Sequence, residues 1–489
     1  MIKYLVYIGF ICSSAFSQEK GVEYYASTIN VSDLQKHLTI IASDSLEGRE
    51  TGQVGQKMAA EYIASHFSNI GIKPYKKKTY YQEFPLLSQK LIVSNLDING
   101  SVNYLEDYYS FPYFGSTFIS FEELLFLGSK IKTKETIKGR VIVLNIDKDL
   151  FDWKYCLEKA REKEVKAVIF VGTNVGAQIK RHKKQYEKEI KSSLIEGPEF
   201  NLPFLFVDKK SFERATRFSL KKLKRLKRRK GSYSFASTGF FKTEVESSKL
   251  VGENVLGYVE GTDLKEELII VTAHYDHIGI HEGIVHNGAD DDGSGTVSIL
   301  EMAEAFSLAK SEGNGPRRSI LFMPVSGEEM GLLGSAYYVE NPTFKLENTV
   351  ANLNIDMIGR MDKAHKGNPD YVYLIGSDKL STELHQISEE ANNSFTKLEI
   401  DYTFNDPKDP NRFYYRSDHY NFAKHNIPVI FYFNGVHKDY HKPTDTIEKI
   451  HFGKIEKITK LIFHTAWQLA NQDKRIEVNV ESDFKNARK

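Results

Sequence analysis

A repeated pattern in the second half of the chain constrains the fold more than any other feature: apolar, β-branched runs stop abruptly at polar residues. The runs are Leu268–Ala273, Ser319–Val325, Val350–Ile355 and Ile427–Phe433. Continuous apolar runs are typical of strands buried on both faces, as in parallel sheets that helices cover. Amphipathic segments at 294–310 and 454–472 supply candidate covering helices. We therefore expect an α/β fold with a mainly parallel, mixed sheet flanked by helices.

Residues that bind metals or move protons follow these runs. In open α/β sheets, ligands bind beyond the carboxyl ends of the strands, which is where these residues would gather. A separate glycine-flanked turn carries three consecutive aspartates, which repel one another unless solvent or a cation neutralises them. The segments are His274-Tyr275-Asp276-His277, Asn287–Gly295, Gly327-Glu328-Glu329, Asp356, and the loop Asn434–Thr446.

Two of these segments combine residues that suit metal hydrolysis. Asp276 stands two residues after His274, so its carboxylate can hold the ring tautomer that leaves one nitrogen free for a metal. Glu328 and Glu329 are adjacent, which suits a division of labour between metal binding and proton transfer. Each segment alone is also compatible with a structural histidine, a surface turn or a solvated helix start.

Taken together, the segments resemble the M28 (leucine aminopeptidase-like) zinc metallopeptidases. The motifs HxD (His274 and Asp276), GADDDGSG, SGEEMGLLGS, NIDMIG and YHKPTDT occur in the family's order over roughly residues 250 to 450. The resemblance implies a zinc-exopeptidase fold, of the phosphorylase/hydrolase-like type, that binds two Zn²⁺ ions. It also implies a role for each residue: Asp291 bridges the two ions, His274 and Asp356 complete one, Glu329 and His441 complete the other, Glu328 is the general base, and Asp276 orients His274.

The resemblance further implies hydrolysis of amino-terminal residues from peptides by a water that bridges the two ions. A phenol would assist, from either Tyr440 or Tyr414, and Arg416 is a candidate for substrate contact. Carboxypeptidase or dipeptidase action, glutaminyl cyclisation, or a catalytically silent binding module remain alternatives on the same fold. Such oxygen and nitrogen sites also accept cobalt or manganese.

The chain's 489 residues exceed what one core usually organises. Short strand candidates at 140–146, 166–171 and 202–207 lie between charged helical stretches, which indicates an insertion that loosely resembles a protease-associated (PA) domain. Residues 31 to about 85 show helical periodicity, and segment 45–52 within them reads as a plain connecting loop. The expected organisation is a signal peptide at 1–17, a helical part at 18–87, a PA-like insertion at 88–245, the peptidase domain at 246–475 and a tail at 476–489.

The first residues predict export, because a short positive start precedes an apolar stretch that ends in small residues before Gln18. Removal of residues 1–17 would leave Cys156 as the one cysteine, so no internal disulfide is expected. A net charge of +1 gives no global field for nucleic acid, and the basic run 221–230 reads as a solvated face. We expect peptide substrates, no stable membrane span and a periplasmic, surface-bound or secreted location, and the sequence does not indicate an oligomeric state.

Overall fold

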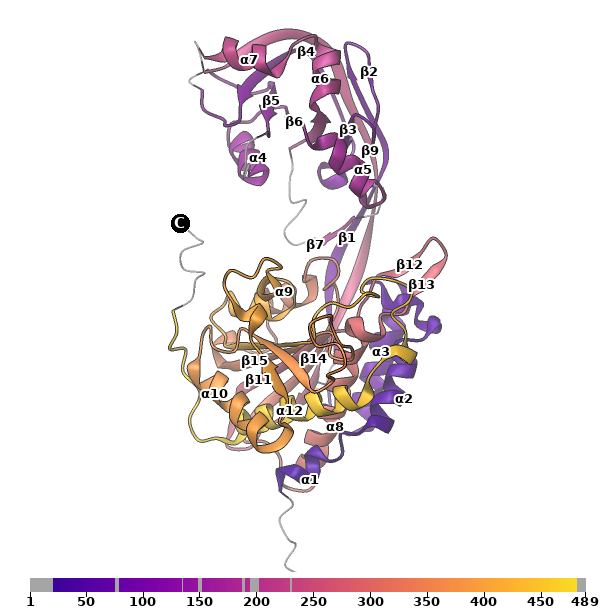
Figure 1. The fold of residues 1–489 in the computed structure, drawn as a ribbon, viewed down its shortest axis with the longest axis vertical. Helices are drawn as coiled ribbons and strands as arrows, with labels where there is room; N and C mark the ends of the chain where they lie inside the picture. Colours follow the sequence, from indigo (N-terminus) through magenta and orange to yellow (C-terminus); the bar gives the residue numbers. More distant parts are fainter. Residues whose placement is uncertain are drawn as a thin grey trace, which may run out of the picture. The chain divides into compact units, whose positions relative to one another are not determined.

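The computed structural model of the chain describes residues 21–74, 79–133, 135–147, 152–186, 190–193, 202–228 and 231–481. These residues divide into two compact units, one formed by the chain up to Gln82 and from Glu253 onward, the other by Glu83–Gly252 (Figure 1). The predicted signal peptide and the last eight residues of the predicted tail lie outside the described residues. Within the described ranges, no helix combines the length and apolar character that a membrane crossing requires.

The first unit is built on a seven-stranded sheet with the order β10-β14-β11-β15-β18-β16-β17. The central strands β14, β11, β15 and β18 run parallel, whereas β10 pairs antiparallel with β14 and β16 pairs antiparallel with β18. Strand β17 pairs parallel with β16. The predicted mainly parallel, mixed sheet is therefore confirmed. The strands of this unit are β10 (Gly257–Val259), β11 (Leu264–His274), β12 (Gly279–His281), β13 (Ile284–His286), β14 (Arg318–Val325), β15 (Thr349–Ile355), β16 (Tyr371–Ile375), β17 (Glu399–Asp401) and β18 (Val429–Phe433).

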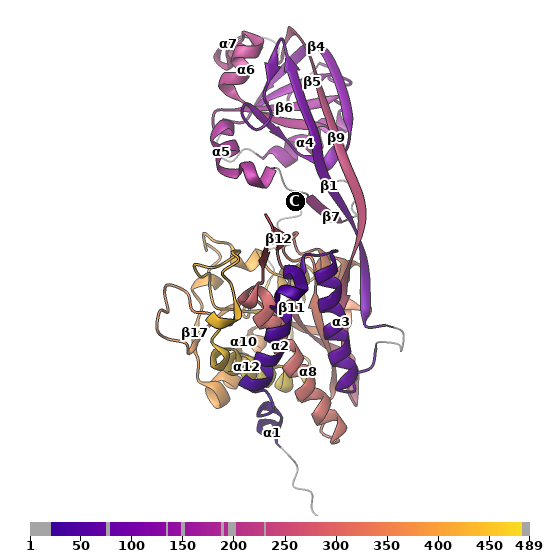
Figure 2. The same cartoon turned by 90° about the vertical axis from the view of Figure 1, so that its right-hand side faces the viewer.

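Helices cover both faces of this sheet. Alternate residues of β11 point to opposite faces, so Ile269 and Val271 join one core with α2, α3, α8 and α12, and Ile270 joins another with α9 and α11. Figure 2 looks onto the first face and shows α2, α3 and α8 side by side. The helices are α1 (Val22–Ala26), α2 (Val31–Ile41), α3 (Val54–Asn69), α8 (Gly295–Ser311), α9 (Leu333–Glu340), α10 (Thr382–Ala391), α11 (His419–Ala423) and α12 (Phe452–Asn471).

The predicted helical segment at 31–85 is too long. The helices end at Asn69, and strand β1 begins at Tyr81. Within this strand Phe84 and Leu86 are buried while Pro85 between them is partly exposed. An alternation of period two is typical of a strand with one buried face, and aromatic residues favour it.

The second unit is built on a nine-stranded sheet with the order β2-β1-β9-β4-β5-β6-β8-β3, in which β7 also pairs with β1. The predicted strands at 140–146, 166–171 and 202–207 correspond to the parallel, buried strands β5, β6 and β8. The elements are β1 (Tyr81–Ile98), β2 (Ser101–Val102), β3 (Tyr108–Ser110), β4 (Thr117–Gly128), β5 (Val141–Asn145), α4 (Trp153–Glu162), β6 (Ala167–Gly172), α5 (Val175–Tyr186), β7 (Ile190–Ser193), β8 (Phe204–Asp208), α6 (Lys209–Thr216), α7 (Leu220–Lys227) and β9 (Tyr233–Val255).

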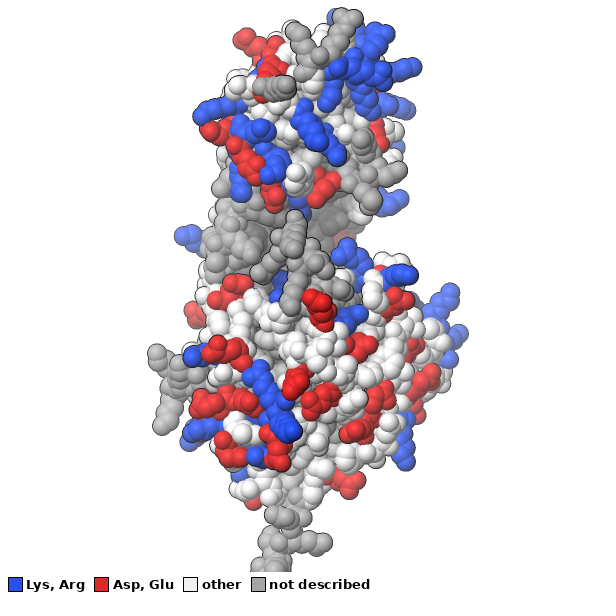
Figure 3. All heavy atoms as spheres, turned by 90° about the vertical axis from the view of Figure 1, so that its left-hand side faces the viewer, with Lys and Arg blue, Asp and Glu red and all other residues white. Residues whose placement is uncertain are grey.

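Most of the basic run lies on helix α7. Leu220 and Leu223 are buried, whereas Lys221, Lys222 and Lys224 are exposed. Figure 3 shows lysine and arginine side chains gathered at this end of the second unit. The helix therefore uses its two leucines to pack and presents its cations to solvent.

Candidate metal centre

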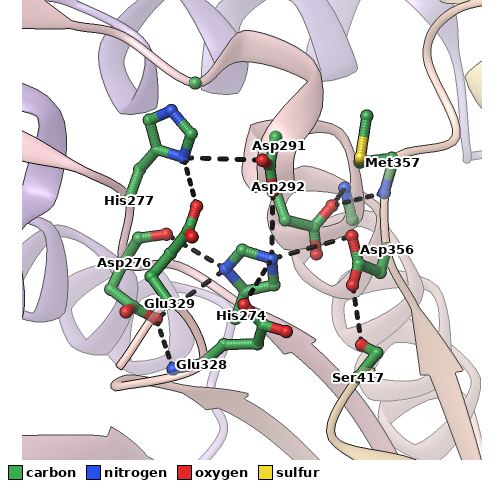
Figure 4. Close-up of polar contacts among 12 residues, drawn as sticks. His274, Asp276, His277, Asp291, Asp292, Glu328, Glu329, Asp356, Met357 and Ser417 are labelled. Atoms are coloured by element: carbon green, nitrogen blue, oxygen red, sulfur yellow. Dashed lines mark hydrogen bonds and ion pairs between the residues drawn. The ribbon is translucent and has the colours of Figure 1, made fainter. Parts of the chain in front are cut away.

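The predicted metal ligands converge at the carboxyl ends of the parallel strands. Figure 4 shows His274, Asp291, Glu329 and Asp356 among them. Their approach follows from the topology, because the ends of adjacent parallel strands share one edge of a sheet. His274 is the last residue of β11, Glu329 follows β14, Asp356 follows β15, Asp291 lies in the π-turn Ala289–Ser294 before α8, and His441 lies in the loop after β18.

Asp291 occupies the middle of the cluster. Its Oδ1 lies 3.3 Å from His274 Nε2, and its Oδ2 lies 3.2 Å from His441 Nε2. The same nitrogen of His441 is 3.2 Å from Glu329 Oε2, and that of His274 is 3.6 Å from Asp356 Oδ1. One carboxylate therefore faces two separate sets of donors with its two oxygens.

The donor atoms suit divalent cations. His274 Nε2, Asp291 Oδ2 and Glu329 Oε1 are buried, yet none has a hydrogen-bond partner in the part of the chain that the structure describes. Buried polar atoms are rarely left without partners, so these three atoms are candidates to bind a cation. Within the described residues, two sets of three side chains bring donor atoms within 4.8 Å of one another: His274, Asp292 and Asp356, and His277, Asp291 and Glu329. Nitrogen and oxygen donors without thiolate are typical of hydrolytic zinc.

The electrostatics favour ionised ligands. Burial raises the pKa of Asp291, but His274 and His441 outweigh burial and hold that pKa well below its usual range. For Glu329, burial and Asp291 raise the pKa, while His277 and His441 lower it to about 2. Asp291 and Glu329 are therefore charged near neutral pH and stabilise positive charge between them.

The pKa of Glu328 is shifted in the opposite direction, upward. Burial above all raises its pKa well beyond the usual value, and the neighbouring carboxylates of Asp356 and Glu329 add to the effect. Its Oε2 lies 3.9 Å from His274 Nε2, and its side chain lines the cavity over the cluster. A carboxyl group whose pKa moves toward neutrality, next to metal donors, suits proton transfer.

Asp276 contacts His274 differently from the sequence-based expectation. Its carboxylate Oδ1 lies 3.7 Å from His274 Nδ1, which is too far for a hydrogen bond. Its main-chain carbonyl oxygen lies 3.0 Å from the same nitrogen. The carbonyl therefore fixes the ring, while the carboxylate accepts a hydrogen bond from the main-chain N–H of Glu328 at 3.3 Å.

Segment 48–52, which the sequence presented as a plain connection, reaches the centre from the amino-terminal part of the unit. Arg49 is fully buried and donates to the main-chain oxygens of Tyr275, Asn287, Gly288 and Ile41 at 2.6–3.0 Å. These contacts brace both the His274 loop and the aspartate turn. No local sequence signal reveals them, because the partners of Arg49 include residues more than 200 positions away.

Two more carboxylates that the sequence analysis did not single out hold the aspartate turn. Asp445 Oδ2 accepts hydrogen bonds from the main-chain N–H groups of Asp290 and Asp291 at 3.0 and 3.2 Å. Asp292 Oδ1 accepts from the main-chain N–H of Met357 at 3.0 Å. The turn that carries Asp291 is thus fixed both from the His441 loop and from the loop after β15.

A cavity opens beside the cluster. Tyr440 lines it, with its ring stacked on His441 at 3.8 Å between centroids, and Arg416 Nη2 donates to the Tyr440 hydroxyl at 3.4 Å. Tyr414 lies elsewhere, buried along a different cavity with Asp378 and Lys379. The lining combines acidic and apolar side chains: Asp291, Glu328, Asp356, Met357, Phe413, Arg416, Phe431, Phe433, Val436 and Tyr440.

Comparison with known families places this site in context. Residues 254–466 match the model of Peptidase family M28. A probable leucine aminopeptidase of Arthroderma otae is 32% identical over 212 residues, which are 42% of this chain and 55% of that protein. Aminopeptidase YwaD of Bacillus subtilis is 36% identical over 109 residues, 22% of either chain. The chain thus spans about half the length, or less, of these curated relatives.

Solved structures share the fold along most of the chain. An aminopeptidase from Aneurinibacillus sp. strain AM-1 superposes with a TM-score of 0.61 at 17% identity, covering 94% of this chain and 99% of that one. BSAP, a zinc aminopeptidase from Bacillus subtilis, superposes with a TM-score of 0.52 at 18% identity, covering 93% and 99%. At this level of identity the likeness shows the fold alone.

Proposed function

We propose that this chain, whose residues 254–466 form a domain of peptidase family M28, is a zinc-dependent aminopeptidase that removes residues from the free amino ends of peptides. The observation that carries the proposal is the position of Asp291, whose two oxygens face His274 on one side and His441 on the other. A single carboxylate in this position suits two ions held close together.

Five side chains would hold the two ions. Asp291 Oδ1, His274 and Asp356 would bind one ion, and Asp291 Oδ2, Glu329 and His441 the other. Bound zinc supplies Lewis-acid polarisation of the peptide carbonyl and a lowered pKa for water.

Glu328 would move the proton. Its carboxylate accepts a proton from the attacking water and then donates it to the amine of the departing peptide. The environment prepares Glu328 for both steps, because burial raises its pKa and so strengthens it as a base. Its main-chain hydrogen bond to Asp276 holds it beside the cluster.

The cavity lining indicates the class of residue removed. Phe413, Phe431 and Phe433 form an apolar wall next to the acidic cluster, which suits an apolar side chain at the amino end of the substrate. The Arg416–Tyr440 pair lines the same cavity and offers hydrogen-bond donors for a peptide carbonyl.

Two further proposals come from the sequence pattern. We infer that residues 1–17 direct export and are removed, and that the unit Glu83–Gly252 is a PA-like module. Mass spectrometry of protein recovered from the exported fraction tests the first, because a mature chain that begins at Gln18 is expected. An intact Met1 in that fraction would contradict it.

The activity is tested with protein expressed from Gln18 and loaded with zinc. One leucine-initiated peptide is offered in three forms, namely free at both ends, acetylated at the amino end and amidated at the carboxyl end. A matching peptide initiated by glutamine is offered beside it. Mass spectrometry should show stepwise loss from free amino ends, blocked by acetylation and insensitive to amidation. Loss from carboxyl ends, or cyclisation of the glutamine without release of a residue, would move the function to a relative on the same fold. No change in any peptide would indicate a silent binding module.

A further inference from the structure

A third histidine stands at the metal cluster. His277, three residues after His274, lies in the loop that follows β11, and its ring faces Glu329 and Asp291 (Figure 4). Its Nδ1 is 2.9 Å from Glu329 Oε1 and 3.8 Å from Asp291 Oδ2. His441 Nε2 approaches the other oxygen of Glu329 and the same Oδ2 of Asp291, each at 3.2 Å. Two imidazoles therefore converge on one pair of carboxylates.

The side chain of His277 is fully buried, and among the described residues neither of its ring nitrogens has a hydrogen-bond partner. The short contact from Nδ1 to Glu329 Oε1 lacks hydrogen-bond geometry, since that oxygen is itself without a partner. A buried imidazole with two unsatisfied nitrogens is costly, and a cation between Nδ1 and the carboxylates would remove that cost at one nitrogen.

The surrounding backbone holds this ring in place. Gly288 has φ +56°, and a Cβ at that position would lie 2.5 Å from His277 Cγ. Because glycine has no Cβ, position 288 leaves room for the His277 ring next to the aspartate turn. The main-chain N–H of His277 donates to Arg49 O at 3.3 Å, so the braced segment 48–52 also fixes the residue.

From this geometry we infer that His277, through Nδ1, is a ligand of the ion held by Glu329 and His441. The inference rests on the proposed two-ion site. That ion then has four protein donors, from Asp291, Glu329, His441 and His277. Four donors match the tetrahedral coordination that is typical of zinc.

Proton NMR of the dicobalt protein in water tests the inference directly. A histidine that binds Co²⁺ through one nitrogen carries a proton on the other, and the paramagnetic ion shifts that exchangeable signal far outside the normal range. Coordination by His274, His441 and His277 gives three such signals. Two signals from protein that holds two cobalt ions would overturn the inference and leave His277 as a hydrogen-bonding neighbour of Glu329.

The variant His277→Ala should show two shifted signals, and the release of one of its two zinc ions should move to a free-zinc concentration 10- to 100-fold higher than in the parent in chelator titrations. His425→Ala changes a partly exposed histidine on the surface and should keep three signals and the parent titration. Circular dichroism confirms that each variant is folded. Parent protein that binds fewer than two ions would contradict the proposed function itself, whereas two ions with two signals contradict only the role of His277.

Discussion

Thr51 donates its hydroxyl hydrogen to Asp276 Oδ2 at 2.8 Å, across 225 positions of sequence. The contact joins the amino-terminal helical part of the first unit to the loop that follows His274. Because residues 83–252 form a separate unit, the metal cluster, whose candidate ligands all follow that unit in sequence, is supported by a stretch of chain that precedes it. Its geometry therefore depends on residues that carry none of the metal-binding chemistry.

Thr51→Val keeps the shape of the side chain and removes its hydroxyl. Asp276 Oδ2 then loses its threonine donor within a buried site, at a cost of about 1–3 kcal/mol. We expect zinc affinity to fall about tenfold, as measured by competition with a chelator, since residues that support ligands typically contribute at this level. Thr39→Val alters an exposed threonine of α2 and serves as the control. Equal zinc affinity in Thr51→Val and the parent would contradict a supporting role.

Arg49→Met removes a buried cation that serves four main-chain carbonyls. The unpartnered carbonyls should lower the free energy of unfolding by about 3–5 kcal/mol, in the upper range for single substitutions. Urea unfolding measures the effect. Arg475→Met is the matched control, because Arg475 is exposed and also donates to two main-chain carbonyls. This substitution should lower the free energy of unfolding by less than about 1 kcal/mol. Similar losses in both variants would show that burial of Arg49 has no special weight.

The two candidate phenols, Tyr440 and Tyr414, lie in different places, so we expect different effects when each is replaced by phenylalanine. Tyr440 lines the cavity beside the cluster, whereas Tyr414 lies on a separate cavity. Tyr440→Phe should lower kcat/KM by about 10- to 100-fold if its hydroxyl polarises the substrate carbonyl. Tyr414→Phe should change kcat/KM by less than about twofold. The reverse order of effects on a leucine-initiated peptide would assign the role to Tyr414.

Glu301 gives the first unit a dependence of stability on pH. Burial, reinforced by Glu304, raises the pKa of Glu301 to about 8, above its unfolded value near 4.5. Between these values the folded state keeps a proton that the unfolded state has released, so the free energy of unfolding falls as pH rises from about 5 to about 8. Glu301→Gln should reduce this fall by roughly 2–4 kcal/mol, at about 1.4 kcal/mol for each pKa unit. Urea unfolding at pH 5 and pH 8 measures it.

Glu23→Gln, at an exposed glutamate, is the control for this pH series. It should follow the parent at both pH values. If Glu301→Gln also follows the parent, Glu301 is ionised in the folded protein and the raised pKa is wrong.

The sequence predicted the sheet well because buried parallel strands have a local signature. The run Val350–Ile355, for example, lies within β15 (Thr349–Ile355). Tyr81 was misassigned because the periodicity of the preceding helices was extended past their end, although the alternation of Phe84 and Leu86 after it is a strand signal. The order of the motifs along the chain identified candidate ligands such as Asp291, which the fold places between His274 and His441.

Other parts of the site depend on distant contacts. Thr51 and Arg49 act on partners that only tertiary folding brings near, so no local pattern could reveal them. His277 belongs to the segment 274–277 that the sequence analysis quoted, but only the structure shows that its ring lies beside Glu329. Asp445 likewise belongs to a matched motif. Its hydrogen bond from the main chain of the aspartate turn forms only because the two loops pack together in the folded protein.

The central claim is that adjacent glutamates divide the chemistry, with Glu328 moving the proton and Glu329 holding an ion. The most direct test measures zinc content and peptide turnover together in Glu328→Gln and Glu329→Gln. We predict that Glu328→Gln keeps two zinc ions and loses at least about 100-fold in kcat, whereas Glu329→Gln loses one ion at limiting free zinc. Full turnover in a two-zinc Glu328→Gln protein, or unchanged zinc binding in Glu329→Gln, would contradict the account.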